Sequence, residues 1–162
     1  MNIARFMLPK ISTVFLHEND TVRQGLERFT RHGFTAVPVL NEKDQYIGSV
    51  TEGDFLRHLL YIRTTDAKAL EHTCIGEIVR RDFCPALTID ADYAEVMTAI
   101  SGQNFVPIVD GRKTLCGILT RQKFIAYLDS LIRSEEISKE EAGGLYGIHE
   151  TESGAAAPGY SD

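Results

Sequence analysis

The 162-residue sequence has no tryptophan and only three cysteines. Cys74, Cys84 and Cys116 are separated by 10 and 32 positions, so no CxxC pair is available for a structural zinc site. An odd number of cysteines also argues against a disulfide framework, and predicts buried free thiols in a reducing compartment. We therefore expect no metal site and no required cofactor.

The sequence also lacks a long apolar run. No stretch approaches the roughly 20 apolar residues that span a bilayer. The first ten residues, MNIARFMLPK, do not contain the apolar segment of a signal peptide. Because 43% of the residues are hydrophobic, the chain has enough apolar material for a folded core. These features predict a cytoplasmic protein without membrane association.

An excess of positive charge is absent as well. Residues 1–133 contain 16 basic and 16 acidic residues, whereas residues 134–162 contain seven acidic residues and one lysine. The formal net charge of −6 therefore comes from the last 29 residues. A neutral body offers no broad basic surface, which argues against nucleic-acid binding. We expect residues 134–162 to form a poorly ordered acidic tail.

An internal repeat organises the rest of the chain. The segment GFTAVPVLNEKDQYIGSVTEGDF, which starts at Gly33, aligns without gaps to GQNFVPIVDGRKTLCGILTRQKF, which starts at Gly102. The offset is 69 over 23 positions, and six residues are identical. The identical residues of the first copy are Gly33, Val37, Pro38, Gly48, Thr51 and Phe55. Such agreement indicates a duplicated structural unit.

Local signals predict the same order of elements in each repeat. Asp20-Thr21 is typical of a helix N-cap, and Gly33 is typical of a helix C-terminus. Between them, Val22, Leu26 and Phe29 lie on one helical face. The predicted strands are 14–17, 36–40 and 46–50 in the first repeat and 86–89, 104–109 and 115–119 in the second. A further helix is predicted at 52–60 in the first repeat, and two helices are predicted at 92–101 and 121–132 in the second.

The fold class that follows is α/β. Two β-α-β-β-α repeats are each too small to be stable alone, so we expect them to pack sheet to sheet with pseudo-twofold symmetry. The predicted organisation is an N-terminal segment 1–12, a first repeat 13–60, a linker 61–82, a second repeat 83–133 and the tail 134–162.

The duplicated motif resembles a pair of cystathionine-β-synthase-type (CBS) domains, also called a Bateman module. The resemblance rests on Ala36–Val39, Gly48–Asp54, Phe105–Ile108 and Gly117–Thr120. It implies a disc of two repeats with clefts that bind adenosine compounds. It also implies a dimer formed through helices, which the broad apolar faces of 52–60 and 121–132 favour. A chain with this pair alone looks like a regulatory sensor rather than an enzyme, and we assign no catalytic residue.

Among stand-alone pairs, the chain is most similar to small bacterial proteins that bind cyclic di-AMP (c-di-AMP). The closer likeness rests on Ile3–Met7, Gly33–Pro38 and Thr120-Arg121. It implies a partner enzyme, for example a (p)ppGpp synthetase. The chain departs from those proteins by keeping Thr51 and Asp54 in its first repeat, which leaves AMP, ADP or ATP as an alternative ligand. A structural module with vestigial clefts is a further alternative.

The chemistry of the first repeat centres on Thr51 and Asp54. Thr51 lies where a strand ends and a helix begins, and the N-terminus of a helix favours an anion. Asp54, one turn later, can accept hydrogen bonds from both hydroxyls of a ribose. Gly48 and Gly53 would leave room for the ligand, and adenine would contact residues 34–37. The same Thr-x-x-Asp spacing also fits a capping box, so both roles stay open.

The second repeat keeps Thr120 but places Arg121 and Lys123 where the first has Glu52 and Asp54. Two cations in the first turn of a helix oppose its dipole, by roughly 0.3–1 kcal/mol each. A bound phosphate would reverse that penalty, and arginine can bind it with two parallel donors. We therefore expect two unequal clefts, in which Asp54 contacts ribose and Arg121, with Lys123, contacts phosphate. The predicted ligand-binding residues are Ser12, Val14, Phe34, Thr35, Ala36, Val37, Pro38, Thr51, Asp54, Asn104, Phe105, Val106, Thr120, Arg121 and Lys123.

Overall fold

The computed structural model describes residues 2–146, and their side chains through residue 135. The chain divides into two compact units, residues 1–124 and residues 125–162. The first unit contains the first repeat and the second repeat as far as residue 124. We describe each unit by itself.

The first repeat forms a three-stranded sheet in the order β2-β3-β4. Its strands are β2 (Leu16–His17), β3 (Ala36–Leu40) and β4 (Tyr46–Thr51). Strand β2 runs parallel to β3, and β3 runs antiparallel to β4. Its helices are α1 (Val22–His32) and α2 (Glu52–Ile62). The linker adds the short helix α3 (Ile75–Ile78) and a 3₁₀ turn, η3 (Ala69–Glu71).

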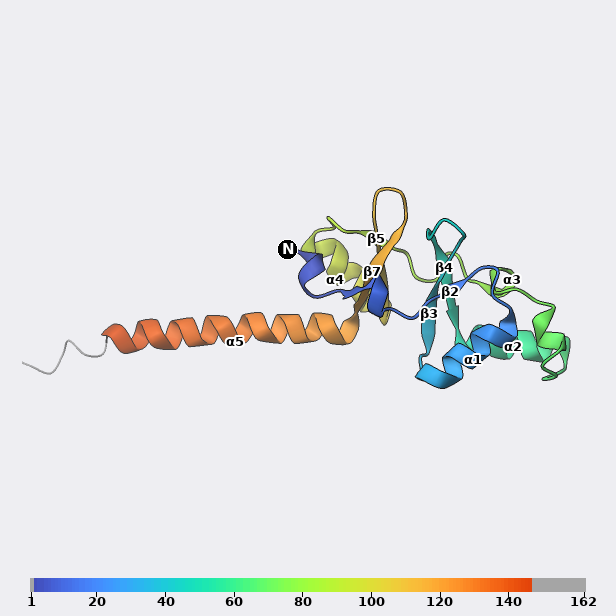
Figure 1. Ribbon diagram of the computed structural model, residues 1–162. Helices are drawn as coiled ribbons and strands as arrows, with labels where there is room; N and C mark the ends of the chain where they lie inside the picture. The colour runs from blue at the N-terminus through green and yellow to red at the C-terminus, as the bar shows by residue number, and fades with distance from the viewer. Residues whose placement is uncertain (1, 147–162) are drawn as a thin grey trace, which may run out of the picture. The chain divides into compact units, whose positions relative to one another are not determined.

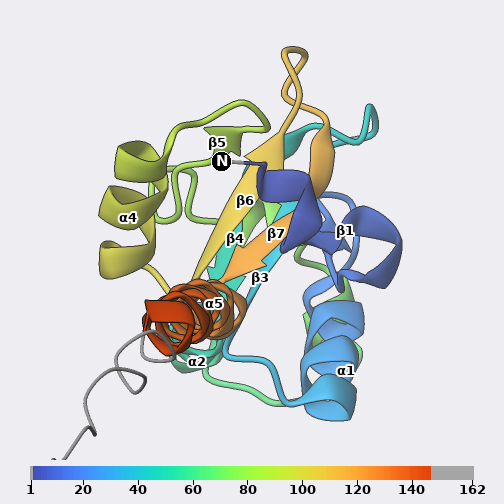
Figure 2. The same ribbon diagram turned by 90° about the vertical axis from the view of Figure 1, so that its left-hand side faces the viewer.

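The second repeat forms a four-stranded sheet in the order β1-β7-β6-β5. Its strands are β1 (Leu8–Pro9), β5 (Leu87–Thr88), β6 (Phe105–Val109) and β7 (Leu115–Thr120), and its first helix is α4 (Tyr93–Gly102). Two 3₁₀ turns flank β1, namely η1 (Ile3–Arg5) and η2 (Lys10–Ser12). The sheets lie side by side, with α1 and α2 outside one and α4 outside the other (Figures 1 and 2).

Local sequence explains where the first helices begin. Thr21 caps α1 by accepting a hydrogen bond from the Gln24 amide, while the Gln24 side chain accepts one from the Thr21 amide. Asp92 and Glu95 make the same reciprocal box at α4. Gly33 ends α1 in the left-handed conformation with a φ of 64°, which glycine adopts without steric penalty. The predicted start and end of α1 are therefore confirmed.

The two hairpins of the repeats pair with each other reciprocally. The Tyr46 amide donates to the Lys113 carbonyl at 3.0 Å, and the Leu115 amide donates to the Asp44 carbonyl at 3.1 Å. Tyr46 and Leu115 are 69 positions apart, and so are Asp44 and Lys113. Equivalent residues thus exchange equivalent bonds, which is the local signature of a pseudo-twofold axis. The predicted fold class is confirmed.

Each repeat also completes the edge of its sheet with a segment from outside its predicted bounds. Strand β1, from the N-terminal segment, pairs with Gly117 and Ile118 of the second repeat. Arg80, from the linker, pairs with Ser49 of the first repeat. Gly48 and Gly117 permit these close approaches because they have no Cβ atom. A Cβ atom at Gly48 would lie 2.6 Å from the Arg80 carbonyl oxygen, and one at Gly117 would lie 2.2 Å from the Leu8 carbonyl oxygen. Strand β1 was not predicted from the sequence.

The apolar core of the first repeat lies between its sheet and its helices. Phe29 of α1 and Phe55 of α2 meet edge to face with ring centroids 4.9 Å apart. The linker also contributes, since Leu70 and Ile75 are 6% and 0% exposed. The remaining buried members of the cluster are Leu16, Val22, Val37, Val39 and Val50.

Helix α5 (Arg121–Tyr146) enters the second unit and is longer than the predicted 121–132 helix. Residues 134–142, SEEISKEEA, are rich in glutamate and contain no proline or glycine, so nothing in that stretch ends a helix. Residues 134–146, predicted as part of a poorly ordered tail, are therefore helical. The rest of that predicted tail, 147–162, lies outside the described residues.

Candidate functional site

Two clefts lie where the repeats meet, one beside each strand-to-helix junction. The first, called the Thr51 cleft here, has a volume of about 240 Å³. It is lined by Thr35, Ala36, Thr51, Phe83, Cys84, Gly102, Gln103, Asn104 and Phe105. The second, the Thr120 cleft, has a volume of about 190 Å³. It is lined by Leu8, Ser12, Val14, Phe34, Thr35, Ala36, Val37, Pro38, Asn104, Phe105, Ile118 and Thr120.

The two clefts share one wall and are related by the repeat. Thr35, Ala36, Asn104 and Phe105 line both, and the first two align with the last two at the offset of 69. Two backbone bonds hold this wall against the junctions. The Glu52 amide donates to the Thr35 carbonyl at 3.1 Å, and the Arg121 amide donates to the Asn104 carbonyl at 2.9 Å.

Each cleft combines parts of both repeats, which the sequence did not predict. Phe34 and Val37 were expected to face Thr51 of their own repeat, but they line the cleft of Thr120, as Pro38 does. Thr51 instead faces Gln103, Asn104 and Phe105 of the second repeat. The reason is the pseudo-twofold axis, which sets the entry to strand β3 opposite the junction of the other repeat.

The structure brings eleven of the fifteen predicted residues to one or both clefts. They are Ser12, Val14, Phe34, Thr35, Ala36, Val37, Pro38, Thr51, Asn104, Phe105 and Thr120. Asp54, Val106, Arg121 and Lys123 are not among the lining residues. Val106 is completely buried inside β6, so it supports the wall from behind. The roles of the fifteen residues in ligand binding stay predictions.

At the Thr51 cleft, the capping box predicted as the alternative role is formed. The Asp54 amide donates to Thr51 Oγ1 at 3.2 Å. In return, Asp54 Oδ2 accepts from the Thr51 amide at 2.8 Å and from the Thr51 hydroxyl at 2.7 Å. Asp54 Oδ1 accepts from Arg57 Nη2. Asp54 is only 6% exposed. It does not line the cleft itself but is hydrogen-bonded to Thr51, which does.

The glycines of this junction have structural roles that differ from the ligand role expected of them. Gly48 faces the Arg80 backbone, as described above, and has a φ of 151° that side-chain-bearing residues rarely adopt. A Cβ atom at Gly53 would lie 3.3 Å from Arg57 Nη1. Gly53 therefore makes room for the Arg57 guanidinium rather than for a cleft occupant.

At the Thr120 cleft, Thr120 Oγ1 accepts from the Lys123 amide at 3.2 Å, but the side chain at position 123 cannot complete a capping box. Arg121 turns toward the C-terminus of α4. Its Nε donates to the Ile100 carbonyl at 3.1 Å, and its Nη2 donates to the carbonyls of Ser101 and Gln103 at 3.3 and 3.0 Å. A cation there satisfies carbonyls that the helix leaves unpaired.

The clefts therefore differ in electrostatics. The first turn of α2 carries Glu52 and Asp54, balanced in part by Arg57. The first turn of α5 contains no acidic residue, and it carries Arg121 and the exposed Lys123. An anion is favoured at the second junction, because the helix dipole and the side-chain charges act in the same direction there.

Sequence reasoning missed Phe83 and Cys84, which line the Thr51 cleft. Phe83 is 40% exposed, and the Arg80 guanidinium carbon lies 4.1 Å from its ring centroid. Burial raises the pKa of the Cys84 thiol, so Cys84 acts as an apolar, protonated wall. The backbone carbonyl of Cys84 accepts a 2.6 Å hydrogen bond from the Tyr46 hydroxyl. No local motif marks these residues, because they belong to the segment that leads into β5.

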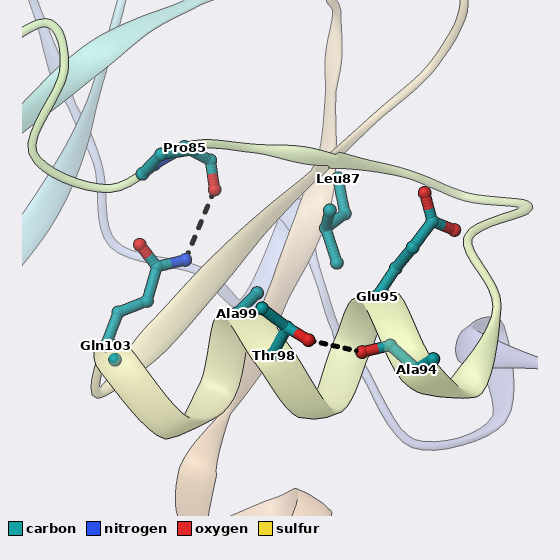
Figure 3. Close-up of a pocket in the computed structure, with 8 residues that line it drawn as sticks. Pro85, Leu87, Ala94, Glu95, Thr98, Ala99 and Gln103 are labelled. Atoms are coloured by element: carbon teal, nitrogen blue, oxygen red, sulfur yellow. Dashed lines mark hydrogen bonds between the residues drawn. The ribbon is translucent and has the colours of Figure 1, made fainter.

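A larger cavity, of about 600 Å³, lies between α4 and the chain that enters β5 (Figure 3), and it shares Gly102 and Gln103 with the Thr51 cleft. Its polar side chains are partly paired internally. Thr98 Oγ1 donates to the Ala94 carbonyl at 2.8 Å, and Gln103 Nε2 donates to the Pro85 carbonyl at 3.2 Å (Figure 3). None of the fifteen predicted residues lines it. It belongs to one repeat alone, so the two clefts are the stronger candidate site.

Within the described residues, no group of three or more His, Cys, Asp or Glu side chains is arranged to hold a metal ion. Across the same part of the chain, no helix combines the length and the apolar character needed to cross a membrane.

Comparison with known proteins identifies the repeats. The family description "CBS domain" matches residues 3–61 and residues 75–130. Protein MJ1225 of Methanocaldococcus jannaschii is 30% identical over 122 residues, which are 74% of this chain and 40% of that protein. Protein MK0525 of Methanopyrus kandleri is 30% identical over 118 residues, which are 67% of this chain and 55% of that protein. The chain thus spans about half the length of the curated relatives it matches.

Solved structures share the fold. CbpB in complex with c-di-AMP has a TM-score of 0.77 and 19% identity, with 85% of this chain and 91% of that chain covered. CbpB of Listeria monocytogenes in complex with c-di-AMP has a TM-score of 0.71 and 19% identity, with 82% and 98% covered. CbpB of Streptococcus agalactiae has a TM-score of 0.71 and 21% identity, with 80% of each chain covered.

Proposed function

This chain belongs to the CBS-domain family, and we propose that it is a regulatory protein that binds an adenine nucleotide in the Thr120 cleft. The observation that carries the proposal is an apolar cleft wall that lies next to a helix N-terminus, at Thr120, whose first turn carries basic residues and no acidic one. Phe34, Val37 and Pro38 supply the wall. Arg121 and Lys123 supply positive charge beside Thr120.

The dimensions of the clefts are those of a nucleoside binding position. Volumes of about 190 and 240 Å³ are smaller than the roughly 300–1,000 Å³ of a pocket for a drug-sized ligand. A base and its sugar fit that scale, and the rest of a larger ligand would extend through the open side. Phe34, 42% exposed, can stack on an adenine ring. Asn104 and Thr120 supply polar groups for its edge or for the ribose.

We propose c-di-AMP as the ligand. It carries two phosphates, which match the cationic junction, and two adenosines, of which one would occupy the Thr120 cleft. The solved CbpB structures with c-di-AMP have the same fold, and that likeness supports the choice without deciding it. AMP, ADP or ATP is the second candidate, and the presence of Thr51 and Asp54 beside the other cleft favours it.

The regulatory role includes two further proposals. The chain forms a homodimer through α2 and the first part of α5, and it signals to a partner enzyme such as a (p)ppGpp synthetase. Exposed apolar side chains on α2 support the dimer. Leu56, Leu60 and Tyr61 are 58%, 67% and 85% exposed. A ligand that prefers one subunit arrangement would shift the equilibrium between arrangements.

A thermal-shift and calorimetry panel tests the ligand. The probes are c-di-AMP, AMP, ATP and S-adenosylmethionine, each with the full chain. At 100 times its dissociation constant, a ligand should stabilise the folded state by about 2.7 kcal/mol. No stabilisation by any probe would indicate a structural module with vestigial clefts and would overturn the proposal.

Two matched phenylalanines locate the bound ligand. Phe34 and Phe83 are 42% and 40% exposed and line different clefts. We expect Phe34→Ala to weaken c-di-AMP binding about tenfold, from the loss of one stacking surface. We expect Phe83→Ala to leave it unchanged. The reverse result would place the ligand in the Thr51 cleft.

A further inference from the structure

Asp54 is a buried carboxylate whose two oxygens are both engaged within the chain. Oδ2 accepts two hydrogen bonds from Thr51, and Oδ1 accepts one from Arg57. The carboxylate side chain is 5% exposed, whereas the arginine side chain is 63% exposed. The Oδ2 edge is therefore held by the helix cap, and the Oδ1 edge is held by a side chain that can move into solvent.

The position of Arg57 depends on the glycine beside it. Arg57 lies one helical turn after Asp54, and its guanidinium reaches back across the first turn of α2. Nη1 lies 3.3 Å from the place of a Cβ atom at Gly53, and the guanidinium carbon lies 3.8 Å from it. A side chain at position 53 would crowd this arrangement. Gly53, Asp54 and Arg57 thus form one local unit in the first turns of α2, directly after Thr51, which lines the cleft.

The second repeat has no counterpart of this unit. The positions that align with Gly53, Asp54 and Arg57 are Gln122, Lys123 and Ala126. The acid and the arginine are thus both present in the first repeat and both replaced in the second. The pair is a feature of the Thr51 cleft alone rather than of the duplicated scaffold.

We infer that Arg57 is a specificity-determining residue that keeps the Thr51 cleft closed to a nucleoside. The inference rests on the proposed function, because it assumes that these clefts accept adenine nucleosides. Oδ2 already accepts two hydrogen bonds, so the hydroxyls of a ribose would donate at Oδ1, where the Arg57 guanidinium already donates. Because the Asp54 side chain is only 5% exposed, a ribose reaches Oδ1 by displacing this charge-assisted hydrogen bond, which is among the stronger polar contacts of a protein.

This competition predicts one bound nucleoside per chain. The Thr120 cleft accepts its ligand directly, because no acid–arginine pair stands at its junction. The Thr51 cleft accepts a nucleoside only after Arg57 has been displaced. The two clefts of one chain therefore differ in affinity even though their walls are related by the repeat.

Calorimetry with adenosine as the probe tests the inference. Adenosine carries the ribose but no phosphate, so it isolates the contact with Asp54. In Arg57→Ala, the buried Asp54 Oδ1 atom loses the hydrogen bond from Arg57. A hydroxyl of the ligand then becomes the favoured donor to this atom. We expect adenosine affinity at the Thr51 cleft to rise roughly tenfold to a hundredfold. Arg57→Gln, which keeps a neutral donor on a shorter side chain, should give the same direction with a smaller gain.

The controls separate this effect from a general change in charge. Arg31→Ala removes an exposed arginine from α1 that lines neither cleft, and it should leave binding unchanged. Adding Phe83→Ala or Asp54→Asn to Arg57→Ala should remove the gain. An Arg57→Ala protein without any gain would overturn the inference, and so would a wild-type chain that binds two adenosines equally well.

Failure of the proposed function gives a different result. If the wild-type chain binds no phosphate-bearing nucleotide at the Thr120 cleft, the proposed function fails. A gain of adenosine binding in Arg57→Ala would then still support the role of Arg57. The two conclusions are therefore tested by separate titrations of the same proteins.

Discussion

The two strand-to-helix junctions have the same backbone and opposite charge. Both begin with a threonine whose hydroxyl accepts the amide hydrogen bond from the residue three positions later. Both donate the next backbone amide to the shared wall. The first junction then carries Glu52 and Asp54, and the second carries Arg121 and Lys123. The duplicated scaffold thus sets where a ligand can lie, and the residues that differ set which charge it can have.

The difference extends to what each junction stabilises. Asp54 turns inward and completes the cap of its own helix. Arg121 turns outward and satisfies the carbonyls at the end of α4. The Thr51 junction therefore makes its side-chain bonds within its own helix, whereas the Thr120 junction is bonded to the end of α4. Gly102 and Gln103, at that end of α4, also line the Thr51 cleft.

The largest effect should come from breaking what the repeats share. Gly117→Ala would bring a Cβ atom to 2.2 Å from the Leu8 carbonyl oxygen, and Gly48→Ala would bring one to 2.6 Å from the Arg80 carbonyl oxygen. Backbone cannot move aside as a flexible side chain can. We expect each variant to lose about 3 kcal/mol of unfolding free energy, measured by urea denaturation.

Gly111→Ala is the matched control, because a Cβ atom there has open space around it. We expect a change within about 0.5 kcal/mol. If Gly48→Ala were as mild as this control, the linker would not lie against β4 as described, and the symmetry of the two edges would be lost.

A second variant separates the junctions. Arg121→Ala removes three hydrogen bonds to the C-terminus of α4 and should lower the unfolding free energy by about 1–3 kcal/mol. Glu52→Ala, at the aligned position, removes an exposed side chain and should change it by less than about 0.5 kcal/mol. Arg121→Lys keeps the charge but not the planar donors, so it should resemble alanine. Equal losses at positions 52 and 121 would contradict the asymmetry.

Much of the scaffold could be predicted because the signals are local and repeated. Strand β3 has its predicted bounds, and α1 begins after the predicted cap. Strand β1 and the contact of Arg80 could not be predicted, because two extended residues carry no periodicity and their partners are distant in sequence. The lining of the clefts was predicted in part, and the pairing of residues within each cleft was not. The sequence indicates that Phe34 and Thr51 both face a cleft, and only the fold shows that they face different clefts.

The side-chain directions at the junctions were the least predictable. The sequence leaves Thr51 and Asp54 between capping and ligand contact, and the structure shows the cap. For Arg121, the expected phosphate contact depends on a side chain that instead donates to α4. Nothing in the spacing of residues 100–103 and 121 indicates that approach, since it arises from the pairing of β7 with β6, the strand that follows α4.

A smaller difference should appear when the two threonines are compared. Thr51→Ala removes a helix cap and a donor to the buried Asp54 carboxylate, and should lower the unfolding free energy by about 1–2 kcal/mol. Thr120→Ala removes a cap that has no reciprocal side-chain bond, and should lower it by about 0.5–1 kcal/mol. The serine variants keep the hydroxyl and should recover most of each loss. A larger loss at Thr120 would reverse the comparison.

The smallest expected effect distinguishes the two hairpin turns. Asn41 and Asp110 occupy aligned positions, and each accepts backbone hydrogen bonds through its Oδ1 atom. The amides of Thr114 and Arg112 favour the charged form of Asp110, which lowers the pKa of its carboxyl group. A lowered folded pKa stabilises the fold above the unfolded pKa of about 3.9. That stabilisation is lost as the pH falls from there through the folded pKa.

Exchanging the two residue types, in Asp110→Asn and Asn41→Asp, tests whether the titration of the turn residue makes stability depend on pH. Urea midpoints measured between about pH 5 and pH 2.5, a window that brackets the unfolded pKa, should fall less steeply in Asp110→Asn than in the wild-type chain. Asn41→Asp should fall more steeply, because it gives the first hairpin the same titrating acceptor. The midpoints at neutral pH should hardly change, since amide and carboxylate oxygens accept the same two bonds. Identical slopes in all three proteins would mean that the pKa of Asp110 is the same in the folded and unfolded chain. The charge difference between the two hairpin turns would then have no effect on stability.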